Sequence, residues 1–473
     1  MPQPIEFDTD YDYPDHVFGI LTELSFFGID MMPLPHFGSG FGQMTTIKQL
    51  HFESCYLVRL SNKTFQRFSS SVEQLTLRNC GLHFVATEDN ALFPFPKLHV
   101  IDFFGTFMHL KHALQLLHPY RNANITTINF GHVSDVSIDR ADQPYVLTIT
   151  VDIMKNLCVI LPKSLEKIDV SYTIGHTFPE ILLIIPKNNS LTYLDVSYSR
   201  TYVAIIILQI RLETFIANGV DYAFARNQMK RPSYNTLKTI VWQNADLNNA
   251  IRQYENHFFE SVRSVESMDI SENDIWYFPE DILKPMSNLT CLFLSKNSLQ
   301  SIPVQLSDHI KVKMLDVRTN RLTSVSSAIR GWADKMQELH GMTLHLTGNA
   351  FECNCDNIDF IRWIQTTKVD LDSRSYQCKL SNGTVIDTLI AYNFLYDLFA
   401  DCKNTMWLTI AFTLLSTFIT ISLLLLAYSK RWKIIFSIYG VIRRVVERQV
   451  WKRYQYDVYI SYEGDIVIWI KMY

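Results

Sequence analysis

The chain has 473 residues, of which 48% are hydrophobic and 19% are charged, and its formal net charge is −4. This length exceeds what one compact core supports, so we expect several domains or one long solenoid. The composition excludes a wholly disordered chain, and the near balance of 43 basic and 47 acidic residues gives no sign of a nucleic-acid partner.

Residues 1–20 begin with Met1-Pro2-Gln3-Pro4 and are acidic from Asp8 to Asp15. A signal peptide needs a basic region followed by an apolar one, and neither is present here. We interpret this segment as an N-terminal remnant. Three explanations stay open for an exported protein: its N-terminal part is missing, the sequence starts too late, or the internal apolar span directs membrane insertion.

Residues 21–350 carry an internal repeat. Three clear units begin at Val265, Leu289 and Val312 and match the pattern L-x-x-L-x-L-x-x-N-x-L, which is the leucine-rich repeat. Weaker copies begin at Leu21, Ile47, Val72, Leu98, Ile125, Leu165, Leu191, Leu212 and Leu237, and a last copy ends at Asn349. Most of the roughly 13 units are 21 to 29 residues apart, but the step from Ile125 to Leu165 takes 40. The pattern predicts an α/β solenoid, a horseshoe with a parallel concave sheet, in which stacking buries the apolar positions.

The Asn position of the repeat predicts a ladder of side-chain amides that bind backbone groups of the turns. Asn273, Asn297, Asn320 and Asn349 occupy it. Other units place Cys55, Cys80, Thr106, Thr173 or Ser199 there, which can do part of this work, or Ile29, Val133, Val220 or Ala245, which cannot. We therefore interpret Cys55 and Cys80 as ladder residues. Cys158 and Cys291 have no partner that the sequence identifies, and residues 131–162 are either a ligand contact or a plain loop insertion.

Residues 351–404 contain a cysteine cluster, namely Cys353, Cys355, Cys378 and Cys402, with an apolar helix around Trp363. An open solenoid end exposes its core, so a closing cap is expected at this place. The C-x-C spacing lacks the usual gap of a zinc ligand pair, and an extracellular location favours disulfides. The sequence alone allows three pairings.

Residues 405–428 form the one long uncharged segment, 24 residues in all. A helix of this length spans roughly 36 Å, enough to cross a hydrocarbon core. Bases dominate the basic linker that follows, residues 429–455, so the positive-inside rule places residues 1–404 outside the cell and 429–473 in the cytoplasm. The linker is either an interfacial helix or solvated, and we expect its bases to contact acidic lipid. Five glycosylation sequons, at Asn62, Asn124, Asn188, Asn288 and Asn382, lie on the outer side.

Residues 456–473 begin with Tyr456-Asp457-Val458-Tyr459-Ile460-Ser461-Tyr462. This run resembles the first box of a Toll/interleukin-1 receptor (TIR) domain, which reads roughly Tyr/Phe-Asp-Ala-Phe-Ile-Ser-Tyr. The matching positions are Tyr456, Asp457, Ile460, Ser461 and Tyr462, whereas Val458 and Tyr459 depart conservatively. Only 17 residues run from Asp457 to Tyr473, so the later boxes and the adaptor-binding loop are absent.

The order of repeats, cysteine cluster, single span and TIR start is similar to that of Toll-like receptors, although the N-terminal cysteine cap and signal peptide usual in that family are absent. The resemblance implies bridges Cys353–Cys378 and Cys355–Cys402. It also implies a single-pass type I glycoprotein of the plasma membrane or endosome that binds microbial or processed ligands in innate immunity. Signalling would occur through homo- or heterodimers, with TIR adaptors as partners only if the domain is completed.

As written, the chain is expected not to signal, and the alternative function is a leucine-rich-repeat adhesion or decoy protein at the cell surface. The TIR-like box favours the receptor, because adhesion members have no reason to carry it. No H-E-x-x-H, G-x-S-x-G or P-loop spacing occurs, so we predict no enzyme, no catalytic or metal site and no cofactor. The 14 histidines are scattered, and a role for them at endosomal pH is conceivable.

Overall fold

The computed structural model describes residues 5–6, 20–31, 37–57, 59–68, 70–81, 86–88, 90–133, 157–173, 181–199, 203–207, 211–220, 235–260, 262–279 and 281–450. These residues belong to two units, 1–393 and 394–473, which we describe separately. The TIR-like box at 456–462 and residues 134–156 of the expected contact or loop region lie outside the described residues.

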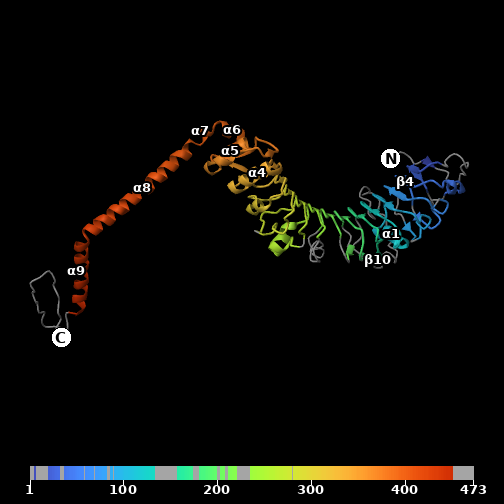
Figure 1. Cartoon of the computed structure of the whole chain (residues 1–473), viewed down its shortest axis with the longest axis horizontal. Coiled ribbons are helices and arrows are strands. Elements are labelled where there is room, and N and C mark those ends of the chain that lie inside the picture. Colours follow the sequence, from blue (N-terminus) through green and yellow to red (C-terminus); the bar gives the residue numbers. More distant parts are fainter. Residues whose placement is uncertain are drawn as a thin grey trace, which may run out of the picture. The chain divides into compact units, whose positions relative to one another are not determined.

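A parallel sheet runs through the whole first unit (Figure 1). Within the described residues it has fourteen strands, hydrogen-bonded in their order along the chain. They are β2 (Glu23–Phe27), β4 (Gln49–Glu53), β6 (Gln74–Arg78), β8 (Val100–Asp102), β9 (Thr127–Asn129), β11 (Lys167–Asp169), β13 (Tyr193–Asp195), β15 (Thr214–Ile216), β16 (Thr239–Val241), β17 (Ser267–Asp269), β18 (Cys291–Phe293), β19 (Met314–Asp316), β20 (Thr343–His345) and β22 (Asp370–Leu371).

The register of the sheet stacks each buried apolar residue on the next. Met268 pairs with Leu292, and Leu292 pairs with Leu315, and all three side chains are fully buried. Burying one such side chain contributes about 1.5–3 kcal/mol, which no unit gains without neighbours. The predicted leucine-rich-repeat solenoid is confirmed. Ile128 pairs directly with Ile168, so the 40-residue step is one long coil of the stack.

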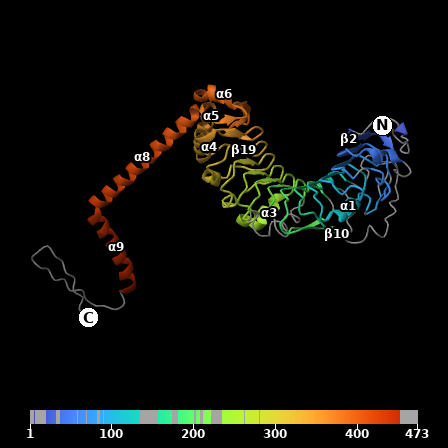
Figure 2. The ribbon, with the colours of Figure 1, turned by 45° about the vertical axis from the view of Figure 1, so that its right-hand side comes forward.

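The outer side of the stack is less regular than the sheet. Figure 2 shows β2 and β19 on the inner side of the curved first unit, and α1 (Leu110–Gln115) and α3 (Leu247–Tyr254) on its outer side. A second parallel sheet, also on the outer side, consists of β10 (Leu157–Ile160), β12 (Ile181–Ile185) and β14 (Val203–Ile207). The described end of residues 131–162 therefore includes an ordered strand, β10.

The core at the N-terminal end of the stack contains a cluster of phenylalanine side chains. The ring centroids of Phe26 and Phe52, in neighbouring strands, lie 4.9 Å apart, and Phe37 contacts Phe68 at 4.7 Å. Phe65 continues the row to Phe95 at 5.2 Å. Aromatic pairs at these separations add to the free energy gained from burial alone. The spine of the solenoid thus changes from aromatic to leucine-rich along the chain.

The cysteine-rich segment continues the sheet past residue 350, where we expected the repeats to end. Its strand β22 pairs with β20 through Leu344 and Leu371. The Asp372 carboxylate then accepts hydrogen bonds from the amides of Leu346 (2.9 Å) and Thr347 (3.0 Å). The segment also contains β21 (Phe351–Cys353), β23 (Gln377–Leu380), β24 (Val385–Asp387), α5 (Ile358–Thr366) and α6 (Thr388–Asn393).

The remaining elements are small or belong to the second unit. At the other end of the chain, β1 (Ile5–Glu6) pairs with β3 (Ile29–Asp30), so residues 1–20 include a strand. A 14-residue helix, α4 (Ser327–His340), lies between β19 and β20. The second unit consists of α7 (Leu395–Leu398), α8 (Ala400–Ser429) and α9 (Arg431–Val450). Helix α8 is longer than the predicted segment 405–428, and its membrane-compatible part is Trp407–Ser429.

Candidate functional site

The inner face of the sheet carries a row of short polar side chains at the strand ends. In each case the side-chain oxygen accepts a hydrogen bond from the amide two residues later, which turns the chain out of the strand. The row consists of Asp102, Asn129, Asp169, Asp195, Asp269 and Asp316. These positions alternate with buried apolar ones, so they lie on the side of the sheet that faces away from the core.

The turn after each strand contains one residue in the left-handed conformation. Its amide donates to a carbonyl of the following coil, as His132 does to Ser171 (2.7 Å) and Tyr172 does to Ser197 (2.6 Å). Non-glycine residues adopt this conformation at a cost of roughly 1–2 kcal/mol, so the regular hydrogen bonds between coils must offset it. The fold therefore presents one side chain per coil at this edge of the inner face.

Three consecutive coils have an aromatic residue at this left-handed position, namely His132, Tyr172 and Tyr198. Phe104, one residue before the left-handed Gly105 of the preceding coil, extends the row, and we call these four side chains the aromatic strip. The ring centroids of Phe104 and His132 are 4.9 Å apart, those of His132 and Tyr172 are 4.3 Å apart, and those of Tyr172 and Tyr198 are 4.7 Å apart. Tyr172 is 41% exposed. His132 is exposed as well, whereas Phe104 and Tyr198 are half-buried. A row of aromatic rings at the surface is typical of binding surfaces.

The aromatic strip borders two carboxylates, Asp169 and Asp195, which face each other in adjacent strands. Burial, and to a smaller extent the charge of Asp169, raises the pKa of Asp195. Burial also raises the pKa of Tyr193 to about 12, with a contribution from Asp195. The ammonium of Lys167 lies 4.4 Å from the centre of the Tyr193 ring. Aromatic rings and carboxylates around one point can bind a cationic group of a ligand.

Glycine at position 219 ends the aromatic strip. It has a φ of +64°, and a Cβ added there would overlap the Tyr198 ring. We expect Gly219→Ala to lower the free energy of unfolding by about 1–2 kcal/mol for the left-handed backbone and by about 1–3 kcal/mol more for the overlap.

The matched control is Gly28→Ala, in the turn after β2, which has the same φ of +64° and free space around the added methyl group. It should show the backbone effect alone. Urea unfolding followed by tyrosine and tryptophan fluorescence compares the two variants. Equal losses would contradict the close packing of Tyr198 on Gly219.

The predicted ladder residues Asn273, Asn297, Asn320 and Asn349 lie one above another inside the stack. Each side-chain amide donates to a carbonyl of the preceding coil, at distances of 2.8, 3.1, 2.9 and 2.9 Å in that order. The thiols of Cys55 and Cys80 donate to the equivalent carbonyls of Phe26 (3.6 Å) and Phe52 (3.4 Å). Burial raises the pKa of Cys80 well above its ordinary value, which disfavours the reactive thiolate.

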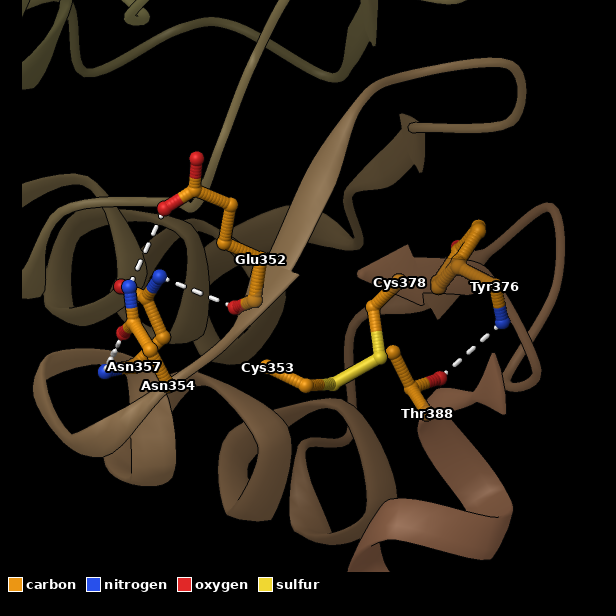
Figure 3. Close-up of a disulfide and its surroundings, with 7 residues drawn as sticks. All are labelled: Glu352, Cys353, Asn354, Asn357, Tyr376, Cys378 and Thr388. Carbon is orange, nitrogen blue, oxygen red and sulfur yellow. Dashed lines mark hydrogen bonds between the residues drawn. A yellow bond between two sulfur atoms is a disulfide. The ribbon is translucent and has the colours of Figure 1, made fainter. Parts of the chain in front are cut away.

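The cysteine-rich segment contains a disulfide between Cys353 and Cys378, the pair that the resemblance implies (Figure 3). Cys355 and Cys402 are each part of a disulfide too. Beside the bridge, Asn357 donates to the backbone carbonyl of Glu352 at 2.9 Å. Across it, the Tyr376 amide donates to the Thr388 hydroxyl at 3.0 Å. Cys158 is free and exposed, and Cys291 is free and half-buried.

The five predicted glycosylation sites all lie in the first unit. Asn62, Asn124, Asn188 and Asn382 are exposed. Asn288 is half-buried, and its side-chain oxygen accepts a hydrogen bond from the Lys311 ammonium at 2.7 Å. Four of the sites are therefore directly open to a glycan, and the fifth requires Lys311 to move.

No family model matches the chain. A stretch of 218 residues, 44% of the chain, is 25% identical to "Toll-like receptor 4" of Pinctada imbricata and covers 24% of it. The chain is a leucine-rich-repeat protein related to Toll-like receptors. A stretch of 122 residues, 25% of the chain, is 27% identical to "Transforming growth factor beta activator LRRC33" of Danio rerio and covers 18% of it. The matches thus span about a quarter or less of these relatives.

Among solved structures, a leucine-rich-repeat protein of Leptospira interrogans, LIC12759, has a TM-score of 0.44 and 15% identity. The alignment covers 78% of this chain and 95% of that one.

Sequence reasoning missed the aromatic strip of this leucine-rich-repeat protein. A signal was present, because His132, Tyr172 and Tyr198 each come directly before a ladder position in three consecutive repeats. An aromatic residue that recurs at a fixed repeat position must stack on its copies in neighbouring coils. The ladder position itself holds Val133, Thr173 and Ser199 in these coils. Aligning the repeats on that position therefore did not reveal the aromatic residue that comes directly before it.

One histidine of this leucine-rich-repeat protein should make stability depend on pH. Burial lowers the pKa of His309 below its ordinary value of 6.5. The unfolded chain then binds a proton that the folded chain does not, so the folded state loses stability as the pH falls below about 6.5. The loss stops growing once the pH is below the pKa of the folded state.

We expect His309→Gln to flatten the dependence of the urea midpoint on pH between about 7 and 5, the range in which a histidine titrates. The matched control, His118→Gln, changes an exposed histidine and should leave the slope unchanged. The same slope in wild type and His309→Gln would contradict this assignment.

Proposed function

We propose that the chain is a single-pass membrane receptor that binds ligands through its leucine-rich repeats outside the cell. The observation that carries the proposal is helix α8. Its segment Trp407–Ser429 is 23 residues long, has a mean hydropathy of 2.3 and is 0% buried within the chain. Side chains such as Phe418 and Leu424 are each 69% exposed. A helix with this length and these uncovered apolar side chains suits the interior of a lipid bilayer.

The orientation of the span rests on charge and on the sequons. Bases follow the span, at Lys430, Arg431 and Lys433, whereas Asp397 and Asp401 precede it. This asymmetry favours the first unit on the outer side. The exposed sequon asparagines of that unit support the same orientation, because glycans are added on the luminal side.

The ligand would contact the aromatic strip and the adjacent pair Asp169 and Asp195. A ligand with a cationic side chain suits this surface, because the carboxylates supply charge and the rings supply flat apolar area. The relation to Toll-like receptors supports recognition of microbial or processed ligands in innate immunity, with pairing of receptors as the signalling step. TIR adaptors would be partners only of a chain with a complete TIR domain.

A topology experiment tests the proposal. The full chain, expressed behind an added signal sequence in mammalian cells, should resist carbonate extraction, and peptide-N-glycosidase should increase its mobility. Asn382→Gln should remove one glycan. Tyr459→Asn creates a sequon on the predicted inner side, and this site should stay unmodified. Extraction by carbonate, or a glycan at position 459, would overturn the proposal.

A further inference from the structure

Helix α9 follows the apolar helix almost without a linker. Helix α8 ends at Ser429 and α9 begins at Arg431, so Lys430 alone separates them. The Lys430 amide still donates to the Leu426 carbonyl at 2.9 Å, which closes the last turn of α8. If α8 spans a bilayer, the first turns of α9 therefore start at the membrane surface.

Helix α9 has two chemically different faces. One face carries apolar side chains at three-, four- and seven-residue spacings, namely Trp432, Ile435, Ile438, Tyr439 and Ile442. They are 64, 51, 53, 69 and 53% exposed, so no described part of the chain covers this face. Lys433, Ser437, Gly440 and Arg444 recur in the same manner on the opposite face.

The charge of α9 identifies what covers its apolar face. Residues 430–444 contain five bases and no acid, namely Lys430, Arg431, Lys433, Arg443 and Arg444. Two copies of such a helix would repel each other, whereas an anionic lipid surface attracts the bases and accepts the apolar side chains. Net charge and apolar area thus both favour a membrane leaflet with acidic headgroups.

The junction of the two helices resembles an interfacial anchor. The guanidinium carbon of Arg431 lies 4.7 Å from the centre of the Tyr428 ring and 5.8 Å from that of Trp432. Tyrosine and tryptophan favour the level of the headgroups, where a stacked arginine reaches phosphate. This cluster explains how Arg431 is accommodated at the start of the apolar face.

We infer that α9 lies in the plane of the inner leaflet, with Ile435, Ile438 and Ile442 among the acyl chains and Lys433 and Arg444 at acidic headgroups. The inference rests on the proposed membrane span. It adds that the segment after the span is a lipid-binding element that distinguishes anionic from neutral membranes.

The test uses the full chain in nanodiscs of phosphatidylcholine, with or without phosphatidylserine. The background carries Cys158→Ser and Cys291→Ser, because these free cysteines are not buried. A fluorophore that responds to polarity is attached at Ile438→Cys or, as the matched control, at Ser437→Cys. With phosphatidylserine, the label at 438 should shift to the blue and be quenched by spin-labelled acyl chains, at least twofold more than the label at 437.

Charge dependence gives a second readout. Arg443→Gln together with Arg444→Gln should reduce the quenching at 438 at least twofold, whereas Arg263→Gln in the first unit should not. Equal quenching at 437 and 438 means a solvated linker and overturns the inference. A label at 438 that is shielded in both disc types but is not quenched by lipid means that another protein surface covers the face, which also overturns it.

A label at Leu423→Cys, inside α8, separates this inference from the proposal on which it rests. Strong quenching at 423 without quenching at 438 leaves the span intact and removes only the in-plane helix. The absence of quenching at 423 removes the span itself.

Discussion

Replacing Asn297 with alanine is expected to lower the free energy of unfolding of the first unit by about 4 kcal/mol, because each buried polar group left without a partner costs about 1–3 kcal/mol. The side-chain oxygen of Asn297 accepts hydrogen bonds from the amides of Asn273 and Ile275, both at 3.0 Å. Its side-chain amide donates to the carbonyls of Ile270 (3.1 Å) and Leu294 (3.0 Å). Alanine leaves both amides without an acceptor inside the stack. The two carbonyls keep a second donor, because the side-chain amide of Asn273 also donates to Ile270 (3.0 Å) and that of Asn320 to Leu294 (2.9 Å).

Urea unfolding and hydrogen exchange of the backbone amides measure the effect. Because each coil contacts only its neighbours, faster exchange should be concentrated between residues 268 and 300 and fade within about two coils. The matched control is Asn249→Ala in α3, an exposed asparagine whose loss should change stability by less than about 0.5 kcal/mol. A similar loss for both variants would show that Asn297 is not part of a structural ladder.

Removing the bridge Cys353–Cys378, by Cys353→Ser with Cys378→Ser, is expected to lower the stability of the cysteine-rich segment by about 3 kcal/mol. The bridge closes a loop with a sequence separation of 25, and loops of that length gain about this much from the restriction of the unfolded chain. Both cysteines are buried, so the change also disturbs the packing around Phe351.

Limited proteolysis shows where the loss occurs. The double variant should be cut within 351–393 well before the repeats, and its thermal transition should begin earlier than that of the wild type. Cys158→Ser, at a free and exposed cysteine, is the control and should leave both measurements unchanged. Resistance of the double variant to cleavage would mean that packing alone holds the segment.

The parts of the fold that follow from periodicity could be predicted from the sequence. The leucine positions and the Asn row depend on contacts that recur in every coil, so a pattern of about 25 residues was sufficient to place them. The same reasoning assigned Cys55 and Cys80 to the ladder. The apolar helix follows from composition alone, because 24 uncharged residues have few other stable environments.

Other parts depend on contacts that no single repeat contains. Strand β22 joins the sheet although residues 370–371 are far from any complete repeat pattern, because the last coil needs a hydrogen-bonding neighbour. The aromatic strip arises from left-handed turns, and such turns have no requirement for aromatic residues. The faces of α9 were visible in the sequence, but a helix and a solvated linker remained open until its continuity with α8 was known.

The hydrogen bonds to Asp372 show that the two ends of the stack differ in their hydrogen-bonding groups. At the turn that follows each strand, amides donate to the next coil, as Val317 does to the His345 carbonyl at 3.0 Å. A stack with this polarity finishes with surplus donors at its last coil. Asp372 meets them with a carboxylate, and the hydrogen bonds from Thr347 and Leu346 lower its pKa although burial raises it. Any element grafted in front of β2 would need the reverse chemistry, offering N–H or O–H groups to carbonyls of the first coil.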